Sequence, residues 1–215
     1  MSVGMEPLHL CAGTLEVEAP DHVLLDYLDV RNGYAWSSYD TLVTNDSAEL
    51  VDGDLLAPNL IGATVDRDRF LLLRELMPRI AGVAQLPGNP IQDATDAELG
   101  QVADLFAVLD DAPYAGRGVR GTILSKVLHR KRPDLVPLYD SRIFDSYTAP
   151  GAIERAAHRT WREFMMLLLT QMRADLQQES EAFDRLLATA EDSGARLTRL
   201  RALDILVWRT AQAWH

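Results

Sequence analysis

The sequence predicts an all-α fold with a short β arm at its N-terminus. Apolar residues recur at helical spacing in several long segments, and turn-forming residues separate these segments. A strand-like alternation of apolar and charged residues appears briefly, at Leu15 to Glu18. The chain has 215 residues, of which 47% are hydrophobic and 25% charged, so it is long enough to bury a substantial core.

The first third of the chain predicts an arm, one helix and a loop-rich segment. Residues 1–19 are expected to form the arm, with an edge strand inside it. Pro20-Asp21 predicts a helix start with Asp21 as the N-cap, and Asn32-Gly33 marks its end. Residues 33–65 combine aromatic residues with turn formers, which favours short helices joined by loops.

Two stronger helical patterns follow. The first begins at Asp66, and Pro78 is expected to bend or end this helix, with a second piece reaching about Val83. The second begins at Thr95, where Glu98 three residues later completes a capping box. This helix is expected to end near Asp110.

Three helices are expected after the central part of the chain, at about 160–176, 180–191 and 196–213. The last carries apolar residues around much of its circumference, which predicts either a buried helix or an interface. In the second case the face of Trp208 would form a homodimer. With no repeat or obvious linker, residues 20–215 are expected to form a single helical unit of two lobes.

Composition indicates which cellular compartment to expect and whether to expect a metal or cofactor. No apolar run approaches the ~20 residues that cross a bilayer, and the N-terminus lacks the pattern of a signal peptide, so no membrane association and a cytoplasmic location are expected. The single cysteine, Cys11, cannot form an internal disulfide and is expected to be a buried or inert thiol. The five histidines show no metal-ligand spacing, so we expect neither a metal nor a cofactor.

The net charge of −11 argues against nucleic acid, whose binding relies on Lys and Arg. The charge is unevenly distributed, however, because residues 112–132 carry six basic residues and no acidic residue. Either this segment gives an acidic protein one basic face, or its charges are solvated and keep the helix soluble.

The central segment 113–144 holds the main candidate residues. Glycines at 116, 118 and 121 directly precede a short basic helix, which Pro133 ends. The first amides of such a helix have no internal partner, so together with Arg117 and Arg120 they form a candidate anion site, although a plain loop is the alternative. The candidate phosphate-binding residues are Gly118, Val119, Arg120, Gly121 and Lys126.

This segment resembles the helix-hairpin-helix core of the base-excision DNA glycosylases. In that superfamily a glycine hairpin precedes a helix, and a catalytic aspartate begins another helix; Gly118-Val119 and Asp140 occupy the matching positions. The run from Arg130 to Asp140 is also similar to an R-K-R-P-x-L-I-P-x-Y-D pattern in uncharacterised actinobacterial proteins. The resemblance implies a two-lobed helix-hairpin-helix glycosylase-like fold with its core at 95–150.

Departures from the superfamily pattern limit what the resemblance implies. Arg120 stands at the second hairpin glycine, and Thr122 stands where bifunctional members carry a catalytic lysine, which argues against lyase activity. No four-cysteine cluster is present for an iron–sulfur centre. A base could stack in a pocket formed by Trp36, Tyr39 and Tyr139, although aromatic residues of helical proteins usually belong to the core.

Two functional hypotheses remain. The first is recognition of DNA or a nucleotide, with monofunctional hydrolysis of an N-glycosidic bond assisted by Asp140. Asp140 can equally be the N-cap of a helix, and the two roles are compatible. The alternative is a non-catalytic module of the same fold that binds a protein partner or a small anionic ligand.

Overall fold

A computed structural model describes residues 5–42, 49–111 and 118–212, so residues 113–117 of the expected hairpin lie outside the described residues. The described chain is mostly helical with one two-stranded antiparallel sheet, which confirms the predicted fold class and the β arm. The strands are β1 (Leu8–Leu10) and β2 (Leu15–Val17); the α-helices are α1 (Pro20–Leu28), α2 (Trp36–Asp40), α3 (Asp52–Leu56), α4 (Arg67–Ile80), α5 (Asp96–Phe106), α6 (Gly121–His129), α7 (Ser141–Tyr147), α8 (Trp161–Gln178), α9 (Ser180–Asp192) and α10 (Arg199–Gln212). Short 3₁₀ helices, among them η2 (Ala57–Ile61) and η4 (Ile91–Asp93), join several of these.

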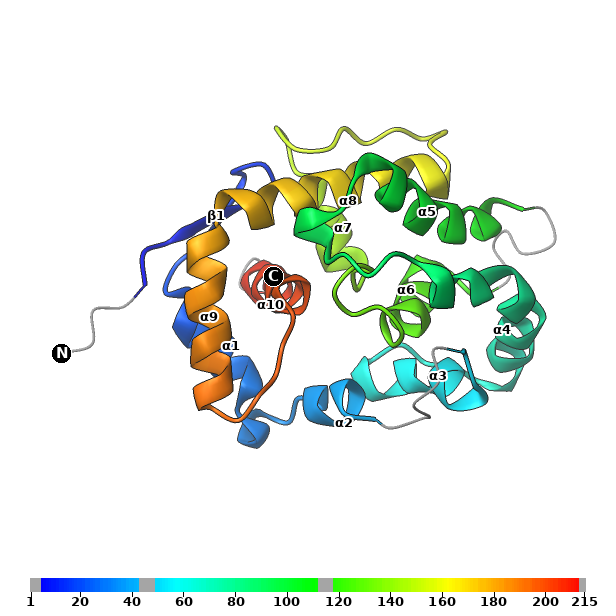
Figure 1. Cartoon of the computed structure of the whole chain (residues 1–215), viewed down its shortest axis with the longest axis horizontal. Coiled ribbons are helices and arrows are strands. Elements are labelled where there is room, and N and C mark those ends of the chain that lie inside the picture. Colours follow the sequence, from blue (N-terminus) through cyan, green and yellow to red (C-terminus); the bar gives the residue numbers. More distant parts are fainter. Residues whose placement is uncertain (1–4, 43–48, 112–117, 213–215) are drawn as a thin grey trace.

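The helices form two groups that share a long helix. One lobe combines the first and last parts of the chain, because α10 packs on α1, α9 and β2. The other lobe contains α3 to α6. Helix α8 packs against α5 in the second lobe and against α9 and α10 in the first. Figure 1 shows α6 and α10 inside the surrounding ring of helices.

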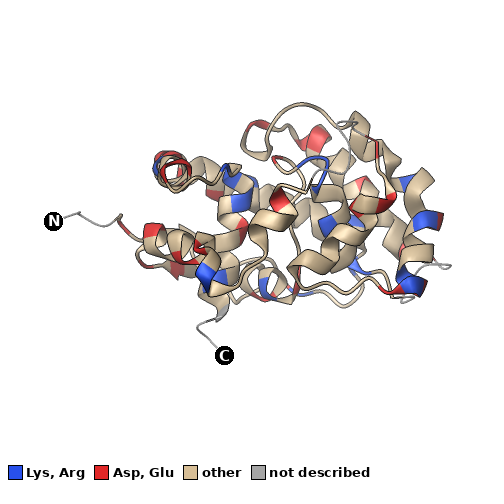
Figure 2. Cartoon of the chain, turned by 90° about the horizontal axis from the view of Figure 1, so that it is seen from below, with Lys and Arg blue, Asp and Glu red and all other residues tan. Residues whose placement is uncertain are grey.

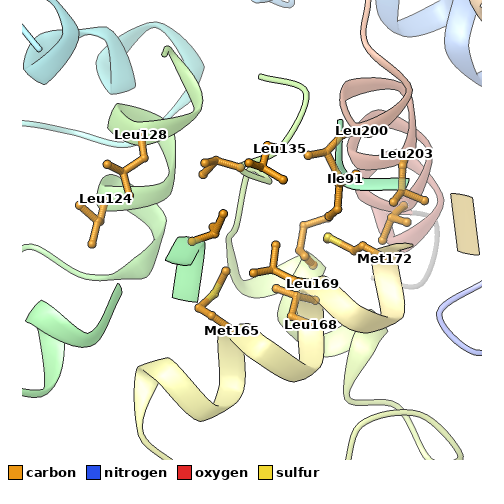
Figure 3. Close-up of a cluster of buried hydrophobic side chains, with 14 of the residues drawn as sticks. Ile91, Leu124, Leu128, Leu135, Met165, Leu168, Leu169, Met172, Leu200 and Leu203 are labelled. Carbon is orange, nitrogen blue, oxygen red and sulfur yellow. The ribbon is translucent and has the colours of Figure 1, made fainter. Parts of the chain in front are cut away.

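One continuous core joins the two lobes. Figure 3 shows Leu124 and Leu128 of α6 on one side and Leu200 and Leu203 of α10 on the other, with the α8 side chains below them. These residues are buried, as are Ile91 of η4 and Leu135 of the loop after α6, which lie between the two sides. Most apolar residues of α10 are therefore covered by the chain itself, whereas Trp208 is only partly buried.

Helix termini agree with the sequence at some positions and differ at others. Thr95 and Glu98 form the predicted capping box. The prediction of Asp21 as an N-cap is wrong: Ala19 occupies that position and Pro20 is the first helical residue, where its missing N–H costs nothing. Pro78 does not end the helix at once, because α4 runs through Pro78 and continues to Ile80.

The β arm is fastened to the first lobe by one buried carboxylate. Asp175 of α8 accepts hydrogen bonds from the Cys11 amide at 2.9 Å and the Tyr147 hydroxyl at 2.9 Å. Cys11 itself is buried, as expected, and it adopts a positive φ of 55° at the hairpin tip. The hydrogen bond to Asp175 thus holds Cys11 in a left-handed backbone conformation, which residues other than glycine rarely adopt.

Candidate functional site

The loop after α6 returns alongside that helix and brings Asp140 to it. Ser125 of α6 accepts a hydrogen bond from the Tyr139 amide at 3.1 Å, and its hydroxyl lies 3.3 Å from the Tyr139 carbonyl oxygen. These contacts fix the residue before Asp140 against the second turn of α6. Asp140 at the start of α7 therefore lies near Lys126, one residue further along α6.

Asp140 is the N-cap of α7. Its Oδ1 accepts from the amides of Arg142 at 3.0 Å and Ile143 at 3.1 Å, as a capping carboxylate does. Its Oδ2 accepts from the indole Nε1 of Trp208 on α10 at 3.0 Å. One oxygen thus holds the helix start, while the other is oriented by a residue from the opposite lobe.

Asp140 lines a cavity of about 280 Å³ between the two lobes. We call this the interlobe cavity; its polar side chains are Lys126, Asp140, Arg201 and Asp204, and its aromatic walls are Tyr27, Tyr34, Tyr139 and Trp208. Gly33, Ala35 and Gly62 also line it and are exposed, so they mark its opening to solvent. The cavity therefore combines charged groups, ring surfaces and an entrance.

Lys126 is a buried amine with unused hydrogen-bonding capacity. Its side chain reaches the cavity from α6, the residue is only 7% exposed, and its Nζ donates to the Ile61 carbonyl at 2.9 Å. Among the described residues no other acceptor bonds to Nζ, although an ammonium has three donors. Burial lowers the pKa of Lys126, and the charges of Asp140 and Asp204 oppose that shift.

Asp204 supplies a second carboxyl group with different protonation behaviour. Burial raises its pKa to about 7; the positive charge of Arg201 acts against this shift, and the charge of Asp140 adds to it. Arg201 Nη1 donates to Asp204 Oδ2, and the same guanidinium bonds the Tyr27 hydroxyl at 3.1 Å. Since Asp204 Oδ1 has no hydrogen-bond partner in the described part of the chain, it is free to meet a ligand.

The aromatic walls are rigid. Tyr27 and Tyr34 stack with ring centroids 4.7 Å apart, and the edge of Trp208 packs on both, with centroids 6.2 and 6.1 Å away. The guanidinium of Arg142 lies over the Trp208 ring at 4.2 Å. The indole that orients Asp140 is therefore held by ring contacts and by a cation–π contact.

The described hairpin residues do not line this cavity. Val119 and Gly121 are buried, and a Cβ atom added at Gly121 would lie 2.4 Å from the Trp161 ring and 2.9 Å from Tyr139. Gly118, with φ +92°, lies beside Arg69, and Arg120 is exposed. Of the five candidate phosphate-binding residues, only Lys126 reaches the cavity that contains Asp140.

The three residues expected to form an aromatic pocket are separated in the structure. Tyr139 lines the interlobe cavity. Trp36 instead donates to the Leu28 carbonyl at 3.1 Å, and Tyr39 donates to the Lys126 carbonyl at 2.6 Å. Both are buried outside the cavity and support the elements that form it.

The basic run after α6 makes internal contacts. Arg130 donates to the carbonyls of Tyr39 and Leu42, and Lys131 pairs with the buried Asp54 at 2.8 Å. Arg132 donates to the Leu86 carbonyl at 2.6 Å.

The side chains of Arg130, Lys131 and Arg132 are only 10%, 6% and 14% exposed. The expectation of solvated charges is therefore wrong for these three residues. They do not contribute to a basic face either, because their charges tie the end of α6 to neighbouring segments. Figure 2 likewise shows Lys and Arg interspersed with Asp and Glu.

Sequence reasoning missed three cavity residues on α10, which are Arg201, Asp204 and Trp208. Trp208 was assigned to an apolar face, while the two charged residues were not singled out. Their signal is the i, i+3 spacing of opposite charges inside a strongly apolar helix, because a charge is rarely buried unless it is paired.

The structure is that of a mostly helical protein with a cavity lined by charged and aromatic side chains. The chain belongs to the Family of unknown function DUF6308, which matches residues 21–211. Neither the curated proteins nor the solved structures contain a match to the chain. In the described ranges, no helix is long and apolar enough to cross a membrane, and no three His, Cys, Asp or Glu residues are grouped to hold a metal ion.

Proposed function

We propose that the protein binds a nucleoside or nucleotide in the interlobe cavity and hydrolyses its N-glycosidic bond with the assistance of Asp140. The observation that carries this proposal is the convergence of Lys126, Asp140 and Asp204 with aromatic walls on one cavity. We also propose that α6, the returning loop and α7 correspond to the helix-hairpin-helix arrangement of the DNA glycosylases.

The size of the cavity favours a single nucleoside unit. Its volume of about 280 Å³ lies just below the ~300–1,000 Å³ typical of small-molecule sites. Tyr34, Tyr139 and Trp208 offer apolar surface to a base, and Lys126 offers donors to a base carbonyl or a phosphate. A free nucleoside or nucleotide fits these features, and its binding needs no extended protein surface of the kind that binds a nucleic-acid polymer.

The charge distribution favours the free ligand over a DNA duplex. Duplex binding draws most of its non-specific affinity from Lys and Arg at phosphates. In this chain Arg130, Lys131 and Arg132 are engaged internally, and the net charge is −11. A small ligand requires only the local charges of the cavity.

Two carboxyl groups in different environments support hydrolysis. The carboxylate of Asp140 is held in one orientation and can stabilise an oxocarbenium-like transition state or activate a water molecule. Asp204 is mostly protonated at pH values below its pKa of about 7, so it can donate a proton to the departing base. Such a separation of roles between two carboxyl groups is how glycosidases carry out acid and base steps at one pH.

The experiment that tests this proposal measures release of free base from a panel of ribonucleosides, deoxyribonucleosides and their 5′-monophosphates. Asp140→Asn should lower the rate at least ~100-fold, since Asn can keep the cap but loses both the charge and the acceptor for Trp208 Nε1. Asp66→Asn is the matched control, because Asp66 caps α4 outside the cavity, and it should retain the rate. A wild type that releases base from no member of the panel would refute the enzymatic proposal.

Binding without turnover is the second candidate function, and Lys126 favours it. A buried amine with one carbonyl partner would gain from a small anionic ligand whether or not a bond is broken. The wild type would then bind nucleoside monophosphates intact, and Lys126→Met would weaken that binding at least tenfold. A protein partner or homodimer through α10 is less favoured, because most apolar residues of this helix are buried and Trp208 is partly buried.

A further inference from the structure

A second and larger cavity lies on the other side of Tyr139. Its volume is about 570 Å³, and it is formed by α7, the first turn of α8 and the loop that joins them. Four aromatic side chains line it together with two arginines: Tyr139, Phe144, Trp161, Phe164, Arg155 and Arg159. We call these six residues the aromatic groove. Tyr139 is the one residue among them that also lines the interlobe cavity.

The rings of the groove pack edge to face or tilted. Tyr139 meets Trp161 at 85° with centroids 5.5 Å apart, and it meets Phe164 at 69° with centroids 5.7 Å apart. Phe144 and Phe164 are tilted by 51°. These contacts fix the ring positions, and none of them is the parallel stacking that a planar ligand would use. The groove can therefore accept one more ring without displacing an existing stacked pair.

The groove is lined by two arginines in an acidic protein. Its lining contains no acidic residue, although the chain has a net charge of −11. Arg159 donates through Nη1 to the Glu154 carbonyl, and its Nε and Nη2 have no partner within the described ranges. Arg155 is partly engaged, because it bonds Thr148 at 2.9 Å and Asp145 at 2.7 Å. Arg159 therefore presents unused donors beside the rings.

We propose that the aromatic groove binds a planar aromatic ring that carries an anionic group such as a phosphate or carboxylate. The ring packs among Tyr139, Trp161 and Phe164, and the anion accepts hydrogen bonds from Arg159. Arginine suits this role because its planar guanidinium matches the geometry of phosphate and carboxylate oxygens. The volume of the groove lies within the ~300–1,000 Å³ range of small-molecule sites. This site is separate from the proposed catalytic cavity and does not depend on it.

Titration calorimetry with 1-naphthyl phosphate tests the proposal. Two compounds separate its parts: 1-naphthol has the ring without the charge, and inorganic phosphate has the charge without the ring. Because both parts contribute, 1-naphthyl phosphate should bind at least tenfold more tightly than either. Equal affinity of 1-naphthol would show that the groove does not recognise an anion, and this result would overturn the proposal.

Variants place the binding in the groove. Arg159→Gln should weaken the affinity for 1-naphthyl phosphate at least fivefold. Arg162→Gln is the matched control, since Arg162 lies on the first turn of α8 but pairs with Asp104 outside the groove, and it should leave the affinity unchanged. Full binding in Arg159→Gln, or an equal loss of binding in Arg162→Gln, would overturn the proposal.

Discussion

Replacing Asp54 by Asn tests whether the basic run after α6 is part of the core structure. Asp54 of α3 is completely buried, and its carboxylate pairs with Lys131 at 2.8 Å and accepts from the Val51 amide at 2.9 Å. Asn can still accept from that amide, so the substitution removes mainly the charge. Lys131, whose side chain is 6% exposed, would then keep a buried charge without its carboxylate.

The expected loss is about 3–5 kcal/mol in the free energy of unfolding, because breaking a buried ion pair from one side strands the other charge. At the ~2–4 °C per kcal/mol typical of a chain of this length, the melting temperature should fall by ~6–20 °C. Urea unfolding followed by circular dichroism gives the free energy, and a thermal scan gives the melting temperature.

Asp52→Asn is the matched control for this measurement. Asp52 lies on the same helix and pairs with Arg74 at 3.5 Å, but the two side chains are 55% and 57% exposed. Solvent screens such a pair, so this substitution should cost less than ~1 kcal/mol. If Asp54→Asn were no more destabilising than Asp52→Asn, the basic run would not be held by buried contacts, and its charges would again be available to a phosphate backbone.

Three further predictions follow from single contacts or charges. Gly121→Ala should cost ~1–3 kcal/mol, since its Cβ would lie 2.4 Å from the Trp161 ring; an unchanged urea midpoint would contradict that packing. Burial lowers the pKa of His129 to about 3 from its usual 6.5, so between these values the unfolded state binds the additional proton and stability falls as the pH decreases; His129→Gln should show a shallower fall in the urea midpoint. Base release should decline above about pH 7 as Asp204 loses its proton, and a rate that stays constant to pH 9 would exclude it as the proton donor.

Local sequence signals predicted most of the helices because their causes are local. The capping box of Thr95 and Glu98, and the apolar periodicity of α5, α8 and α9, depend on residues within a few positions of one another. The position of Asp140 at a helix start was predicted for the same reason. Asp21 was misassigned because Pro20 can occupy the first helical position, which shifts the cap to Ala19.

The contents of the candidate site were only partly predictable, because they depend on contacts between distant segments. Asp140 and Lys126 were singled out from the central segment, and the structure brings them to one cavity. Arg201 and Asp204 come from a helix whose apolar pattern indicated a buried helix or an interface, not a polar site. The contacts of Arg130 with two backbone carbonyls could not be predicted, since those acceptors lie 88 and 91 residues away in the chain.

A crystal structure with a C-nucleoside tests the central claim most directly. The carbon–carbon bond between base and sugar in such a compound resists hydrolysis, so the ligand should remain intact. Our account predicts the ligand in the interlobe cavity, with its sugar beside Asp140 and a ligand oxygen within hydrogen-bonding distance of Lys126 Nζ. A structure in which the compound occupies another surface while Lys126 keeps the Ile61 carbonyl as its single partner would contradict it.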